Sequence, residues 1–187
     1  MRTMDLEKEY LEIVEGILNS EEFEKRKKYR HHENESVYEH CLEVSYLSYK
    51  IAKKYGFDYK SAAIGGLLHD FYPYPWQYTE EEKELYKIPQ RPKNPLKQHG
   101  FTHAREALEN ARKHFPEYVT PKIENMILRH MFPLNIRPPR YMESWIVTFA
   151  DKYVSARVLK HPRSYYKYIG LEGLIKKVEK YVRKRGD

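Results

Sequence analysis

The sequence lacks a second cysteine and any long hydrophobic run. Because Cys41 has no partner in the chain, an internal disulfide is impossible and a disulfide-stapled secreted scaffold is excluded. Apolar stretches such as 62–68 and 145–150 fall far short of the roughly 18–20 residues that a membrane span requires. The N-terminus, MRTMDLEKEY, also lacks the apolar core of a signal peptide. We therefore expect a cytoplasmic protein that does not associate with membranes.

Charge and aromatic content indicate a globular chain. The 187 residues include 34 Lys and Arg against 27 Asp and Glu, giving a formal net charge of +7 when the nine histidines are neutral. Eighteen tyrosines are more than a disordered chain would carry. The length predicts one domain spanning 1–187. The positive charge attracts nucleic acid, anionic lipid or phosphorylated small molecules, without choosing among them.

Apolar residues recur at helical spacing along almost the whole chain, and no strand alternation stands out. We predict an all-α helical bundle of about seven to nine helices. A helix over 5–28 and another over 164–185 are expected to pack on a core at about 31–160. Five prolines between Phe71 and Pro95 predict a long loop or lid. The tyrosine-rich stretch 164–185 also allows a homodimer.

Local signals mark where particular helices begin and end. Ser36 and Glu39 have the spacing of a capping box and predict a helix start. The pair Gly65-Gly66 weakens the next helix unless close packing requires the missing side chains. That helix is expected to run to His69.

Residues suited to metal binding recur on these helices. Neutral imidazole and carboxylate groups suit first-row transition metals, and helices packed side by side can each project a ligand into one centre. Neighbouring residues on a helix point about 100° apart, so His69 and Asp70 reach one centre only if their helix ends there. Pro73 agrees with such an end. In chain order the candidates are His40, His69, Asp70, His99, His130 and Asp151.

The order and local context of these residues resemble the HD superfamily of metal-dependent phosphohydrolases. The resemblance is nearest to a bacterial branch with two additional histidines between the HD pair and the last aspartate, and it covers roughly residues 31–160. The strings HDFYPYPW, HGFTHA and RPPRY are similar to those of small HD proteins from Gram-positive bacteria.

The resemblance implies one or two divalent transition metal ions, with iron preferred and Mn, Co, Ni or Zn as alternatives. A metal-activated hydroxide would then hydrolyse a phosphate ester or anhydride, most simply of a nucleotide. The implied roles are imidazole ligands at His40, His69, His99 and His130, a bridging Asp70, and Asp151 completing the first site. If only His40, His69, Asp70 and Asp151 bind, the site is mononuclear.

The chain departs from the family pattern where many members have lysine and this one has Pro73. Phosphate neutralisation must then come from other cations, for which the candidates are Arg129, Lys152, Arg137 and Arg140. His103 lies four residues after His99, on the same helical face, and either could be the ligand while the other contacts substrate. We favour His99 as the ligand because glycine follows it, as in the family.

Other features leave alternatives open. Tyr72 and Trp76 could stack on a nucleobase, or the loop that carries them could pack on the core. A regulatory HD scaffold or a nucleic-acid-binding protein is the alternative function, although no nucleic-acid-binding signature stands out. The histidines outside the motif, His31, His32, His114 and His161, are expected at the surface.

Overall fold

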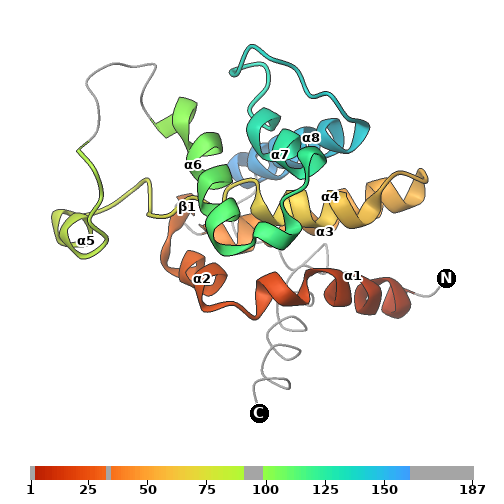
Figure 1. Cartoon of the computed structure of the whole chain (residues 1–187), viewed down its shortest axis with the longest axis horizontal. Coiled ribbons are helices and arrows are strands. Elements are labelled where there is room, and N and C mark those ends of the chain that lie inside the picture. The colour runs from red at the N-terminus through yellow and green to blue at the C-terminus, as the bar shows by residue number, and fades with distance from the viewer. Residues whose placement is uncertain (1–2, 33–34, 91–98, 161–187) are drawn as a thin grey trace.

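The computed structural model describes residues 3–32, 35–90 and 99–160. Within these ranges the protein contains eight α-helices and one two-stranded sheet, which confirms the predicted all-α bundle (Figure 1). The predicted helix over 164–185 lies outside the described residues. None of the helices in the described ranges is both long and apolar enough to cross a membrane.

Longer connections precede α5 and separate α7 from α8. The α-helices are α1 (Thr3–Leu18), α2 (Glu21–Glu24), α3 (Val37–Lys54), α4 (Tyr59–Leu68), α5 (Glu80–Leu85), α6 (His99–His114), α7 (Pro121–Arg129) and α8 (Met142–Lys160). The 3-10 helices are η1 (Lys25–Lys28) and η3 (Pro116–Tyr118), and the strands are β1 (Arg30–His32) and β2 (Glu35–Ser36).

The N-terminal region differs from the single helix predicted over 5–28. The first helix ends at Leu18, and Ser20 caps α2 by accepting a hydrogen bond from the Phe23 N–H at 3.1 Å. The antiparallel pair β1–β2 follows, with Arg30 opposite Ser36. Its strands have three and two residues, too short to show the period-two pattern that reveals a strand in sequence.

Close packing of α3 against α4 forms the centre of the fold. The predicted capping box opens α3: the Ser36 hydroxyl accepts from the Glu39 N–H at 3.2 Å, and the Glu39 carboxylate accepts from the Ser36 N–H at 2.8 Å. A Cβ atom on Gly66 would lie 2.7 Å from the Cα atom of Ser45 in α3. Glycine at this position therefore lets the two helices approach, which is the close-packing alternative that the sequence left open.

The main hydrophobic core lies among α1, α3, α4, α6, α7 and α8. Figure 1 shows α1 along one side of this body and α5 standing away from it. Apart from α5, the segment 71–90 is irregular, as its prolines predict. It begins inside the core, because Phe71 and Tyr72 are buried. A lid role for this segment stays a prediction.

Candidate metal centre

The HD pair sits where α4 ends. Leu68 is the last residue of α4, and His69 is its C-cap, which lets His69 and Asp70 point into the same region. The Nδ1 atom of His69 lies 2.8 Å from the carbonyl oxygen of Gly66. A carbonyl only accepts, so Nδ1 carries the proton of this hydrogen bond. The Nε2 atom of the neutral ring is then left with a lone pair directed away from the helix.

The end of α7 repeats this arrangement. His130 is the C-cap of α7, and its Nδ1 atom donates to the carbonyl oxygen of Ile127 at 2.7 Å. Its Nε2 atom also presents a lone pair. Two helices thus deliver imidazoles of the same tautomer to one region. Such hydrogen bonds at the outer nitrogen are what orient histidine ligands in metal proteins.

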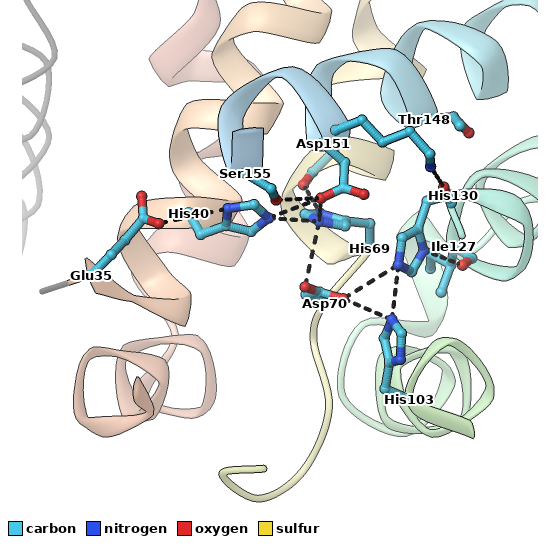
Figure 2. A network of polar contacts seen from close by, with 12 residues as sticks. Glu35, His40, His69, Asp70, His103, Ile127, His130, Thr148, Asp151 and Ser155 are labelled. Carbon is cyan, nitrogen blue, oxygen red and sulfur yellow. Dashed lines mark hydrogen bonds and ion pairs between the residues drawn. The ribbon is translucent and has the colours of Figure 1, made fainter. Parts of the chain in front are cut away.

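Three elements bring together a first group of candidate ligands: His40 from α3, His69 from the end of α4 and Asp151 from α8 (Figure 2). The Nε2 atom of His40 lies 3.3 Å from Nε2 of His69 and 3.2 Å from Oδ1 of Asp151. All three residues are buried. Their spacing suits one cation held in the middle.

A second group lies on the other side of Asp70 (Figure 2). The Nε2 atoms of His103 in α6 and His130 lie 3.0 Å apart, and each lies 3.5 Å from Oδ1 of Asp70. The other oxygen of this carboxylate, Oδ2, lies 3.6 Å from Nε2 of His69. Asp70 therefore faces both groups of ligands, one with each oxygen.

The electrostatics of the two groups suit cations. Burial opposes the charged form of Asp70, but the nearby His69 and His103 imidazoles lower the pKa of its carboxyl below the ordinary range. Burial also opposes the charged form of Asp151, whose pKa is lowered by His40 and His69. Both carboxylates are therefore anionic at neutral pH. Buried anions of this kind are costly unless they are paired with positive charge.

The pKa values of His130 and His69 are shifted in opposite directions. Burial lowers the pKa of His130 to about 3, so its ring is neutral at pH 7. Burial also disfavours charge on His69, but the carboxylates of Asp70 and Asp151 raise its pKa well above the ordinary value. The negative charge of these two carboxylates would equally favour a cation beside His69. Imidazole nitrogens and carboxylate oxygens converging in a buried region are a donor set that fits divalent transition metals.

A comparison with protein-family models matches residues 37–156 to the HD domain. The chain belongs to the HD-domain family. Its HD domain places it in a superfamily of metal-dependent phosphohydrolases, as the sequence motifs indicated. No curated protein and no solved structure matched the chain.

Two of the four basic side chains predicted to neutralise phosphate lie beside the candidate ligand His130. The Lys152 ammonium group donates to the carbonyl oxygen of His130 at 2.9 Å, and burial lowers its pKa. Arg129 is the last residue of α7, is half-buried, and precedes His130. The other two candidates, Arg137 and Arg140, are exposed in the segment before α8. The Arg140 N–H donates to the side chain of Asn125.

The aromatic residues predicted to contact substrate lie in the packed part of the loop after the HD pair. Tyr72 is buried, with its ring centroid 6.4 Å from that of His103. Trp76 is half-buried and packs against the main core. Both positions agree with the packed loop that the sequence left open. His99 is the first residue of α6, and its side chain lies outside the described part of the structure. The residue brought beside Asp70 and His130 is His103.

One residue at the centre was missed by the sequence reasoning. His31 was expected at the surface, but its ring stacks on that of His40, with 3.9 Å between centroids. Its ligand atom also groups with those of His40 and Asp70. No local sequence pattern predicts the position of His31, because the residue is brought to the centre by strands too short to recognise in the sequence.

Proposed function

We propose that this HD domain is a metal-dependent hydrolase of phosphate ester or anhydride bonds, with a nucleotide as substrate. The observation that carries the proposal is the position of Asp70. Its two oxygens face separate sets of imidazoles, at 3.6 Å on one side and 3.5 Å on the other. A carboxylate placed in this way can be shared by two cations, as phosphoryl-transfer centres with two metals require.

The proposed ligands form two sites. His40, His69 and Asp151 hold one ion, His103 and His130 hold the second, and Asp70 serves both. In this assignment His103 takes the role that the sequence favoured for His99. Mixed imidazole and carboxylate ligands suit iron, our first choice, and they also suit Mn, Co, Ni or Zn.

When bound, such ions lower the pKa of a water molecule and offset negative charge on phosphoryl oxygens. The protein's own residues hold and orient this centre. The hydrogen bonds from Nδ1 of His69 and His130 fix the two imidazoles with Nε2 inward. Lys152, anchored on the His130 carbonyl, and the adjacent Arg129 would supply positive charge to a phosphate group.

A nucleotide is the proposed substrate, and the positive charge of Lys152 and Arg129 beside the centre suits its phosphate groups. Arg137 and Arg140 would add contacts to an anionic tail. The +7 net charge of the chain favours a phosphorylated ligand in general. We also propose that the protein is cytoplasmic and forms a homodimer. The alternative, a regulatory or nucleic-acid-binding HD scaffold, is less favoured because a scaffold has no need of so complete a ligand set.

The test is metal analysis joined to a phosphate-release screen over a panel of nucleotides. We expect about two transition metal ions per chain and metal-dependent release from at least one nucleotide. Asp70→Ala should lose both, while His114→Ala, at a half-exposed histidine on α6, should retain both. Circular dichroism checks that each variant is folded. Metal-free protein with undiminished hydrolysis would contradict the proposal, and EDTA-insensitive nucleic-acid binding without hydrolysis would favour the alternative.

A further inference from the structure

The hairpin β1–β2 lies outside the matched HD range, 37–156, and yet it contacts the metal centre. The rings of His31 on β1 and His40 on α3 are stacked, with an interplanar angle of 28°. Both ring nitrogens of His31 are shielded from solvent. A histidine on the protein surface would instead have its ring nitrogens in contact with water. His31 as a whole is half-buried, and its nitrogens therefore lie on the shielded side of the ring.

The backbone holds this hairpin firmly on the helix that carries His40. Arg30 pairs with Ser36, which is also the N-cap of α3. The Val37 N–H donates to the carbonyl oxygen of Tyr29 at 2.8 Å. The Tyr29 hydroxyl in turn donates to the carbonyl oxygen of Pro73 at 2.8 Å, just after the HD pair. The position of His31 is thus fixed from both the α3 side and the HD side.

The distances around His31 fit a shared ligand set. One ligand atom each from His31, His40 and Asp70 lie within 4.8 Å of one another. Two ligands on opposite sides of one cation, with bonds of about 2.0–2.2 Å, lie about 4.0–4.4 Å apart. The three ligand atoms therefore lie near the spacing of a shared ion, and binding requires the stacked His31 ring to turn one nitrogen toward that ion.

The second strand adds a carboxylate behind His40. Glu35 is buried, and its Oε2 atom lies 3.9 Å from Nδ1 of His40 (Figure 2). At this distance the carboxylate does not hydrogen-bond to His40, but its negative charge faces the outer nitrogen of the ring. The hairpin therefore approaches His40 at two places, the ring face through His31 and the outer nitrogen through Glu35.

We propose that the hairpin contributes to the metal centre. In this proposal His31 supplies an additional imidazole ligand to the cation held by His40 and Asp70. This inference rests on the proposed metal centre. A further neutral nitrogen ligand makes the site richer in imidazole without adding charge. Such a site discriminates in favour of iron, cobalt, nickel or zinc over magnesium, which prefers oxygen ligands.

The experiment is a cobalt(II) titration of the full chain, followed by visible absorption and by X-ray absorption counting of imidazole ligands. His31→Ala removes both the ring and its nitrogens. His31→Phe keeps a ring to stack on His40 but has no ligand atom. His114→Ala is the matched control. We expect the two His31 variants to bind cobalt at least about tenfold more weakly than the wild type, with an altered spectrum and a lower imidazole count.

The possible failures are distinguishable. If His31→Phe binds cobalt with the wild-type affinity and spectrum while His31→Ala does not, His31 acts by stacking alone and the inference is overturned. If both variants match the wild type, it is overturned as well, while the proposed centre stands. If the wild type binds no cobalt, zinc or iron, the proposed function fails together with this inference.

Discussion

His103 and His130 approach each other to 3.0 Å between their Nε2 atoms, although they lie on different helices. Both nitrogens lie 3.5 Å from the same oxygen of Asp70. Because burial keeps His130 neutral at pH 7, its Nε2 lone pair is available to a metal ion. This relationship points to His103, one turn inside α6, as the ligand on that helix.

His103→Ala is therefore expected to remove one metal equivalent and to lower phosphate release about 100-fold or more, since the second ion loses a direct ligand. His99→Ala is the matched variant one turn earlier and should retain the metal stoichiometry. Elemental analysis and a phosphate-release assay on the two proteins make the comparison. Metal loss in His99→Ala with full occupancy in His103→Ala would reverse the assignment.

Metal binding is expected to stabilise the protein against heat. A ligand that binds only the folded state contributes about 2.7 kcal/mol at a concentration 100 times its Kd. The metal-loaded protein should thus unfold at a higher temperature than the EDTA-treated one. Asp70→Asn should abolish that difference, because both groups of imidazoles lose their shared carboxylate. Differential scanning calorimetry with and without cobalt measures it, and an undiminished metal-dependent rise in Asp70→Asn would contradict the shared role.

Arg26 is expected to hold the HD segment in place from outside the matched range. It is completely buried, its guanidinium donates to the Tyr72 carbonyl oxygen at 2.7 Å, and it lies 3.9 Å from the centroid of the Phe71 ring. Arg26→Met should lower the free energy of unfolding by about 3 kcal/mol, since it leaves the buried Tyr72 carbonyl without its partner and removes one of the two cations that hold the Glu22 carboxylate. Urea unfolding measures this effect. Lys28→Met, at an exposed lysine of the same segment, is the control and should change it by less than about 0.5 kcal/mol.

Local patterns in the sequence predicted the helix boundaries near the centre. The capping box at Ser36 and the helix end at His69 appear in the structure because each depends on residues within four positions of it. The pair Gly65-Gly66 was ambiguous alone, and only the partner helix α3 shows why a side chain at Gly66 has no room. Helical periodicity likewise predicted the bundle but missed the break that Ser20 makes in the N-terminal region.

The choice of residues at the centre depended on longer-range geometry. His99 and His103 share a helical face, so spacing along α6 does not distinguish them. The neighbours that distinguish His103 are Asp70 and His130, from other parts of the chain. His31 reaches the centre through tertiary packing of its hairpin on α3. Order along the chain identified the kind of site, but the packing of separate helices decides which imidazoles enter it.

The carboxylate of Glu22 should make stability depend on acidity. Burial alone would raise its pKa, but hydrogen bonds from Lys25 and Arg26 lower that pKa from 4.5 to about 2. A carboxyl whose pKa is lower in the folded state contributes stability above its unfolded pKa and loses it as the pH falls. The contribution of Glu22 should therefore be complete at pH 6–7, decline below about 4.5 and vanish near 2.

Glu22→Gln removes this titrating group, and the variant is expected to be about 1 kcal/mol less stable than the wild type at pH 7. The expected value is modest because the Glu22 side chain is partly exposed to solvent. The difference between the two proteins should shrink as the pH falls from 4.5 toward 2. Urea unfolding at several pH values, in EDTA so that metal loss adds nothing, measures it. Glu21→Gln, at an exposed carboxylate on the same helix, is the control. A difference that persists unchanged to pH 2 would show that the Glu22 carboxylate stabilises the fold through something other than its charge.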